Sequence, residues 1–257
     1  GGTLSVGELQ VSGPRFSNAG GTLNVGRGFD ARVGQFENAG GTITAGQVQV
    51  TATSADLDNR DARIISDGDM QLRVAGDLLN ANGEVGSAGT LQIQANSLDN
   101  GGSAKTRAGA DSYIDLRGAL VNEGSITSGN NTTITAAVVQ SGSQATLGAG
   151  IQSDGSLATQ GRVEVSAERS LRAHGTQLAV GPISLRASNI DLSGSTTSAA
   201  EINAVANSGN IDTSAAKVIT PGTLSLQASS LAWQALVNAG GTIHAGELDL
   251  NLANIRN

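Results

Sequence analysis

One phrase recurs along the chain at intervals that indicate a structural repeat. It stands at 17–26 as "SNAGGTLNVG", at 37–46 as "ENAGGTITAG" and at 237–246 as "VNAGGTIHAG". A catalytic loop does not return in this way within one chain, whereas the units of a solenoid do. The period of the repeat is therefore the first property to establish.

Asparagines mark the period. The intervals between Asn18, Asn38, Asn59, Asn80, Asn100 and Asn122 are 20, 21, 21, 20 and 22 residues. Strand-like segments keep the same pace, from "ELQV" at 8–11 through "TTITA" at 132–136 to "ELDLNL" at 247–252. Each unit contains short runs that alternate apolar and polar residues, separated by Gly, Asn, Asp or Ser, without a sustained helical period. The units are thus predicted to consist of short strands and tight corners.

Composition narrows the class of protein further. The chain has 36 Gly but only 1 Trp, 1 Tyr and 3 Phe, so its core must be thin and built from small aliphatic side chains. The net charge of −7 and the scattered basic residues argue against nucleic-acid binding. Without cysteine there is neither a disulfide framework nor a thiolate metal site, and no cofactor is predicted. No apolar run is long enough to span a membrane or to form a signal peptide.

Strands this short at so regular a pitch are typical of coils in which each strand pairs in parallel with its equivalent one period later. The predicted fold is all-β: a right-handed parallel β-helix, or solenoid, of about 12–13 coils of about 20 residues each. Residues 1–257 are expected to form a single segment with more irregular coils at about 140–162 and 194–222. Because the chain begins and ends inside its own pattern, we interpret it as an excerpt of a longer filament.

The repeated phrase is predicted to be a corner of the coil. Its paired glycines permit a positive φ where a Cβ would clash, and the asparagines are expected to stack and pass amide hydrogen bonds from coil to coil. The predicted corner and ladder residues are Asn18, Gly20, Gly21, Asn38, Gly40, Gly41, Asn59, Asn80, Asn100, Asn122, Asn238, Gly240 and Gly241.

Units of this length, with the corner N-x-G-G-T-[I/L] and strands such as "GELQV" and "GELDLNL", closely resemble the haemagglutinin repeats of filamentous haemagglutinin and of contact-dependent growth-inhibition exoproteins. The resemblance is strongest over 1–136 and 223–257. It implies a Gram-negative two-partner secretion system, in which an outer-membrane transporter exports an exoprotein that forms a long filament. The expected location is the bacterial cell surface, and the expected partner is that transporter.

Two groups of polar residues are candidates for reactive sites. Asp56, Asp58, Asp61, Asp67 and Asp69 lie close together in sequence, and acidic pairs on β-helices can hydrolyse glycans or bind calcium. Asp also caps turns, and corner chemistry is the favoured interpretation. The two histidines, at positions 174 and 244, lie far apart in sequence, and no nucleophile-elbow pattern marks a serine. We therefore predict no catalytic residue and no metal site.

Two kinds of side chain could bind glycans: aromatic rings and arginines. Aromatic platforms are scarce; Phe16 and Phe36 stand one period apart and are expected to stack inside, whereas Trp233 is expected to fill a wider coil. Arginines one period apart become neighbours about 5 Å apart across coils. The hypothetical glycan contact residues are Arg27, Arg32, Arg60 and Arg63.

Three classes of function follow. A structural shaft that holds distal domains away from the cell requires only regular coils, and it is the favoured prediction. The alternative is an adhesive surface on the shaft that binds a receptor or a glycan on a host or neighbouring cell. An enzyme would require an acidic or metal-binding cluster across adjacent coils, so no enzyme is predicted.

Overall fold

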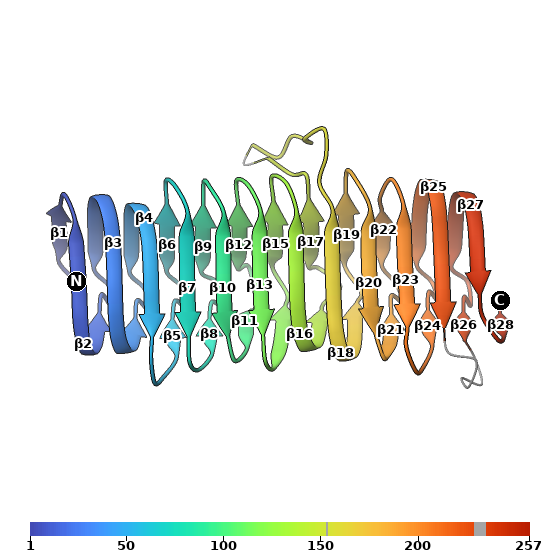
Figure 1. Ribbon diagram of the computed structural model, residues 1–257, viewed down its shortest axis with the longest axis horizontal. Coiled ribbons are helices and arrows are strands. Elements are labelled where there is room, and N and C mark those ends of the chain that lie inside the picture. The colour runs from blue at the N-terminus through green and yellow to red at the C-terminus, as the bar shows by residue number, and fades with distance from the viewer. Residues whose placement is uncertain (153, 229–234) are drawn as a thin grey trace. The chain divides into compact units, whose positions relative to one another are not determined.

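The computed structural model describes residues 1–152, 154–228 and 235–257, and these contain β-strands and turns but no helix. The chain divides into two compact units, Gly1–Ile126 and Thr127–Asn257. Within each unit, the described strands pair in parallel, and each strand pairs with its equivalent in the next coil (Figure 1). Each unit is therefore a parallel β-solenoid, and the predicted fold class is confirmed.

Unit 1 contains fourteen strands, and a fifteenth runs across its boundary with unit 2. They are β1 (Thr3–Val6), β2 (Leu9–Ser17), β3 (Thr22–Glu37), β4 (Thr42–Ala52), β5 (Leu57–Asp58), β6 (Arg63–Ser66), β7 (Met70–Val74), β8 (Leu78–Leu79), β9 (Glu84–Ser87), β10 (Leu91–Ala95), β11 (Leu98–Asn100), β12 (Lys105–Ala108), β13 (Ser112–Leu116), β14 (Ala119–Asn122) and β15 (Ser125–Ser128).

The strands of unit 2 follow the same plan over its described residues. They are β16 (Thr132–Ser141), β17 (Thr146–Ala149), β18 (Val163–Ala173), β19 (Thr176–Ala179), β20 (Ile183–Ala187), β21 (Asn189–Asp191), β22 (Thr196–Ser198), β23 (Ile202–Ala206), β24 (Ile211–Asp212), β25 (Lys217–Ala228), β26 (Leu236–Val237), β27 (Thr242–Asn251) and β28 (Ile255–Arg256).

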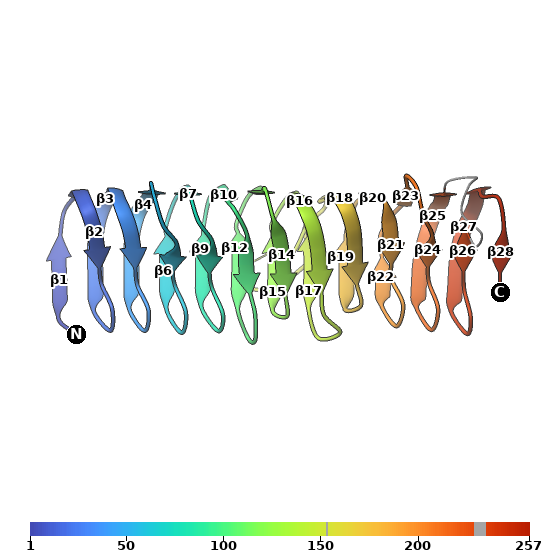
Figure 2. The same ribbon diagram turned by 90° about the horizontal axis from the view of Figure 1, so that it is seen from below.

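The strand register gives unit 1 six coils. The first strand residue of each coil pairs with the first strand residue of the next coil. In the regular part of unit 1, a coil consists of three strands such as β6, β7 and β8. Figure 2 shows β6, β9 and β12 side by side, as their pairing requires. The successive partners that begin each coil are Thr3, Thr22, Thr42, Arg63, Glu84 and Lys105.

Alternation along each strand builds the core of unit 1. In β7 the side chains of Met70, Leu72 and Val74 point inward and are buried, whereas Gln71 and Arg73 point outward. Because partners are equivalent residues, the inward positions stack into apolar columns along the coil axis. Burying each large aliphatic side chain of these columns stabilises the fold by about 1.5–3 kcal/mol. The core of unit 1 is thus a narrow interior of stacked apolar columns and not one broad hydrophobic core.

The three phenylalanine rings lie at one end of these columns. Phe16 and Phe36 are direct partners with ring centroids 4.9 Å apart, and Phe29 packs against both. Phe29 and Phe36 are fully buried. The rings therefore fill the interior rather than forming an exposed sugar platform.

The number of residues in a coil varies more in unit 2 than in unit 1. Thr146 pairs with Thr176, 30 positions later, because the described residues 150–152 and 154–161 leave the coil, and Ile151 bridges Leu157 there in antiparallel fashion (Figure 1). Within 194–222, Thr196 pairs with Lys217, 21 positions later, whereas the pairing of β25 with β27 shifts register between Thr220 and Thr223. Leu224 then pairs with Leu248, so that coil is also enlarged. Trp233 lies outside the described residues.

Candidate functional site

A column of asparagines runs along one corner of unit 1. Each side chain donates a hydrogen bond from Nδ2 to Oδ1 of the asparagine in the next coil. The N···O distances are 2.8 Å from Asn18 to Asn38, 2.8 Å from Asn38 to Asn59, 2.7 Å from Asn59 to Asn80, 2.9 Å from Asn80 to Asn100 and 2.8 Å from Asn100 to Asn122.

The same nitrogens also satisfy the backbone at the corner. Asn38 Nδ2 donates to the carbonyl of Arg63 at 3.0 Å, and Asn59 Nδ2 donates to that of Glu84 at 3.1 Å. Five of the six asparagines are fully buried, where an unpaired amide would cost about 1–3 kcal/mol. The column is therefore a stabilising element, built from residues that the sequence period had grouped together.

The glycines of the corner have two different reasons to be there. Gly20, Gly40 and Gly240 have φ of 61°, 65° and 68°, which disfavours any residue with a Cβ. Gly41 is excluded from substitution by space, because a Cβ there would lie 2.3 Å from the carbonyl oxygen of Asn18. Ala62 occupies the position equivalent to Gly41 in the next coil, so this second requirement is not universal.

The aspartates weighed as catalytic residues are engaged in corner contacts. Asp56 accepts the backbone N–H of Asp77 at 2.8 Å, and Asp69 accepts that of Thr90 at 2.8 Å. Asp58 forms an ion pair with Arg60 at 2.7 Å, and this contact lowers the pKa of the Asp58 carboxyl. The carboxylates of Asp56 and Asp69 thus bond to the next coil, whereas that of Asp58 bonds within its own corner. Over the described part of the chain, no group of three or more His, Cys, Asp or Glu side chains could hold a metal ion.

The two histidines occupy separate places in unit 2. His174 donates from Nε2 to Asp191 at 3.0 Å, and Ser193 lies 3.5 Å from the same nitrogen. A nucleophile and an orienting acid must face opposite ring nitrogens in a Ser-His-Asp relay, so this cluster lacks the geometry of a triad. Burial raises the pKa of Asp191, but the bonds from His174 and Ser193 outweigh burial and lower it overall. His244 lies in β27, paired with Ile219.

The four arginines of the glycan hypothesis are not gathered in one place. Three of them are paired with carboxylates: Arg27 with Glu8 at 3.3 Å, Arg60 with Asp58, and Arg63 with Glu84 at 2.9 Å. Arg32 lies on a different face of the coil, on β3, and makes no hydrogen bond or ion pair with another described residue. The four do not form one site.

A different set of arginines does converge. Arg32, Arg73 and Arg117 line a groove of about 480 Å³ on unit 1, together with Thr51, Gln94 and Asp115. Arg32 and Arg73 belong to one column two coils apart, because both pair with Thr51. Sequence reasoning missed this groove because it considered neighbours one period apart, whereas Arg32 and Arg73 are two periods apart. Counting two periods from Arg32 would have found Arg73.

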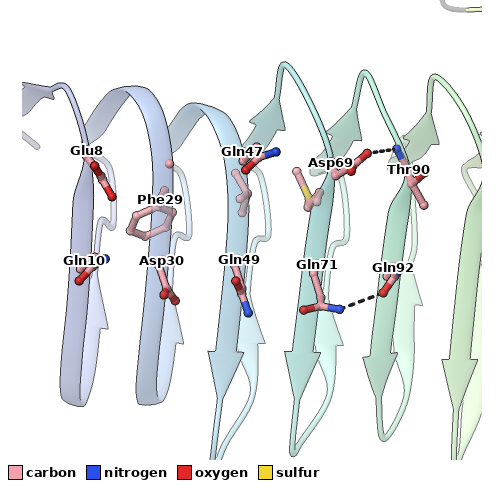
Figure 3. A pocket seen from close by; sticks show the side chains of 13 residues that line it. Glu8, Gln10, Phe29, Asp30, Gln47, Gln49, Asp69, Gln71, Thr90 and Gln92 are labelled. Carbon is pink, nitrogen blue, oxygen red and sulfur yellow. Dashed lines mark hydrogen bonds between the residues drawn. The ribbon is translucent and has the colours of Figure 1, made fainter.

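A shallow trough of about 510 Å³ lies beside the groove on the same face, and Figure 3 shows its polar lining. Gln71 donates to Gln92 at 2.9 Å, whereas Gln10 and Gln49 make no hydrogen bond with another described residue. No basic side chain lines the trough. The polar side chains along it are Glu8, Gln10, Asp30, Gln47, Gln49, Asp69, Gln71, Thr90 and Gln92.

Membrane insertion through a helix finds no support in the described residues. None of them belongs to a helix that is both long and apolar enough to cross a bilayer.

Stacked parallel coils with an internal asparagine column define a repeat solenoid, a class in which each coil contacts only its neighbours. Haemagglutinin repeats match residues 3–82, 45–112 and 86–167. The chain belongs to the haemagglutinin repeat family, which confirms the resemblance inferred from its corners. It is 32% identical over 216 residues to a protein of Yersinia pestis named Toxin CdiA. That alignment covers 83% of this chain but only 5% of the relative, and no solved structure matches.

Proposed function

We propose that this chain is a length of shaft in a large secreted exoprotein displayed on a bacterial cell surface. The observation that carries the proposal is the in-register pairing of equivalent residues in successive coils, reinforced in unit 1 by five consecutive amide links. Such a structure resists bending without a large core, because each coil is tied to the next by backbone and side-chain hydrogen bonds. The shaft would hold more distal parts of the exoprotein away from the cell, and no catalytic role is proposed for it.

Family membership supports the setting of this shaft. Haemagglutinin repeats and the similarity to Toxin CdiA favour export by an outer-membrane two-partner secretion transporter, which we propose as a partner. The parent protein would be an adhesin or a contact-dependent toxin-delivery exoprotein. The chain spans only 5% of that relative, and we propose that any toxin activity of the parent resides outside these coils.

A block exchange in the full-length parent tests the shaft proposal. These coils are replaced by an equal number of register-matched coils from another part of the filament, and binding to target cells is measured. We expect binding to be retained, because length and stiffness are preserved. Loss of binding with export and surface display intact would contradict a purely structural role.

A second candidate function is an adhesive contact with an anionic glycan on a target cell. The observation that favours it is the groove of Arg32, Arg73 and Arg117, in which Arg32 has no carboxylate partner. Arginine recognises sulfate and carboxylate groups through paired N–H donors. The groove therefore replaces the four separate arginines as the glycan contact.

Binding to immobilised heparin, a sulfated polysaccharide, tests this candidate. The double variant Arg32→Glu/Arg73→Glu should lose binding by at least about tenfold, in keeping with the loss of two charge-assisted contacts. Arg60→Glu/Arg63→Glu is the matched control, since it makes the same charge change at arginines outside the groove. Equal losses in the two double variants would contradict a specific site.

A further inference from the structure

The sequence places glycine directly after asparagine at two points, Asn82–Gly83 and Asn100–Gly101, and both lie in unit 1. Asn100 is the one member of the asparagine column that is followed by glycine, since alanine, arginine or glutamate follows the others. Asn82 lies outside the column, at a corner with φ of 54°, and it is exposed. The same dipeptide thus occurs in two environments.

An asparagine followed by glycine can react with its own backbone, because glycine has no Cβ to obstruct the approach. The backbone nitrogen of the glycine bonds to Cγ of the asparagine, and the bond between Cγ and Nδ2 breaks. The amide leaves as ammonia with the proton of the glycine N–H, and a five-membered succinimide ring remains. Water then opens the ring at either carbonyl and gives aspartate or isoaspartate. Water is the only co-reactant.

Four hydrogen bonds hold the Asn100 amide in the folded coil. Its Nδ2 donates to Asn122 Oδ1 at 2.8 Å and to the Ser125 carbonyl at 3.2 Å. Its Oδ1 accepts from Asn80 Nδ2 at 2.9 Å and from the Thr106 hydroxyl at 2.9 Å. Asn100 and Thr106 are fully buried. Because the reaction expels Nδ2 as ammonia, the bonds from this nitrogen must break before the ring can form.

The Asn82 amide is held less firmly. Its Nδ2 donates to Asp61 at 3.3 Å, and its Oδ1 accepts the backbone N–H of Ser103 at 3.2 Å. The attacking nitrogen, that of Gly83, donates to the carbonyl of Asn80 at 2.8 Å. At Asn82 the fold therefore restrains the attacking nitrogen, whereas at Asn100 it encloses the amide that is attacked.

We propose that Asn100–Gly101 is a latent modification site, silent while the column is closed and reactive when unit 1 opens. The product does not fit the column. A carboxylate at position 100 offers no N–H to Asn122 or Ser125 and sets a second acceptor against Asn122 Oδ1. It also buries a charge without a cationic partner, and isoaspartate adds one atom to the backbone of the corner. Unfolding of unit 1 therefore becomes irreversible with time.

The chain offers a matched control at Gly101. Its carbonyl accepts a backbone N–H from the preceding coil, as those of Ala39 and Ala81 do, so alanine already occupies this position in other coils. Gly101 has no positive φ, and the nearest atom to a Cβ there is Oδ1 of Asp99, at the end of a rotatable side chain. Gly101→Ala should therefore fold, and it gives Asn100 an ordinary following residue.

Mass spectrometry of peptides from the full chain tests the proposal. The wild type is incubated at mildly alkaline pH, one sample in buffer and one in denaturant, and the modified fraction at each site is followed with time. In denaturant, Asn82 and Asn100 should react at similar rates. In buffer, we expect Asn100 to react at least about a hundredfold more slowly than in denaturant and to be better protected than Asn82.

Two variants examine the cause of the protection. Thr106→Val removes one bond to Asn100 Oδ1 and should accelerate the reaction at Asn100 in buffer about fivefold, more than any change at Asn82. Gly101→Ala should slow the reaction at Asn100 in denaturant at least about tenfold, because the added Cβ obstructs the attacking nitrogen. Circular dichroism in buffer checks that both variants are folded.

Refolding measures the consequence. Chains aged in denaturant are returned to buffer, and hydrogen exchange is followed over the coils that contain Asn100 and Asn122. The aged wild type should lose protection there in proportion to the fraction modified at Asn100. The aged Gly101→Ala chain, which still reacts at Asn82, should recover its protection.

Three results would overturn the proposal. The first is a reaction at Asn100 that is as fast in buffer as in denaturant. The second is an unchanged rate at Asn100 in folded Thr106→Val, since the four bonds would then not be the protection. The third is an aged wild type that refolds as completely as the aged Gly101→Ala chain.

Discussion

The two units fill the same corner of the coil with different residues. In unit 1 the position is held by asparagine in six successive coils, and every link between them is made. In unit 2 the corresponding positions include Ala173, Leu192 and Thr213, and an asparagine returns only at Asn238. Leu192 and Thr213 donate their backbone N–H to the next coil as Asn38 and Asn59 do. The backbone corner therefore tolerates either chemistry.

Unit 2 places buried polar groups elsewhere. Gln177 and Thr197 are fully buried on β19 and β22, where Thr197 donates to the Gln177 carbonyl at 2.8 Å. The Nε2 group of Gln177 has no partner among the described residues. The unpaired donor reduces the stabilisation that this polar pair contributes, whereas each column asparagine from Asn18 to Asn100 has a partner for its amide nitrogen.

The largest loss of stability is expected from a substitution that interrupts the asparagine column of unit 1. Asn59→Leu removes the bonds with Asn38 and Asn80 and leaves a donor and an acceptor buried without partners. We expect a loss of about 3 kcal/mol in the stability of unit 1, measured by hydrogen exchange with mass spectrometry, which resolves the two units. Thr213→Asn in unit 2 is the control and should change stability by less than about 1 kcal/mol. Equal effects would remove the distinction drawn between the two corners.

A smaller loss is expected from the left-handed corner. Gly40→Val forces a β-branched residue into φ of 65° and should destabilise unit 1 by about 2 kcal/mol in thermal or denaturant unfolding. Gly28→Val is the matched control, since Gly28 has no positive φ and a Cβ there meets no atom within 4 Å. If both variants unfold at the same denaturant concentration, the backbone conformation is not what requires glycine.

The buried polar pair of unit 2 should be replaceable. Gln177→Leu/Thr197→Val removes both partners together with the unsatisfied donor, and we expect a gain of about 1 kcal/mol in unit 2. Gln177→Leu alone should gain less, because it leaves the Thr197 hydroxyl buried with a poorer partner. A loss of stability in the double variant would show that the pair contributes to the fold despite its unsatisfied nitrogen.

The smallest effect is expected in the pH dependence of the stability of unit 2. The pKa of Asp191 is lower in the folded state, so its bonds with His174 and Ser193 stabilise unit 2 above the unfolded pKa of about 3.9. This contribution disappears as the pH falls through the folded pKa. The group is partly exposed, so we expect no more than about 0.5 kcal/mol. Asp191→Asn should flatten the acid limb of unit 2 stability by that amount, and an unchanged acid limb would contradict the assignment.

The sequence was sufficient to predict the parallel solenoid, because the period appears in both the asparagines and the alternating strands. It also placed Phe16 and Phe36 in one column, as the structure has them. The arginine groove was missed, because Arg32 and Arg73 are neighbours only after two periods are counted. Residues 194–222 suggested irregular coils, since Ser, Thr and Ala are frequent there. Composition could not locate the irregularity within this region, and in the structure the register of β25 against β27 shifts between Thr220 and Thr223.

The asparagine column also gives unit 1 a dipole directed along its coil axis. In parallel strands the backbone N–H groups point alternately toward the two neighbouring coils, so their dipoles largely cancel along the coil axis. The side-chain amides do not alternate, because every Nδ2 from Asn18 to Asn100 points toward the coil that follows. Each amide carries about 3.5 D, so the column is a row of aligned dipoles with its positive end toward Asn122. One residue type, repeated, gives this β-structure the polarity otherwise associated with an α-helix.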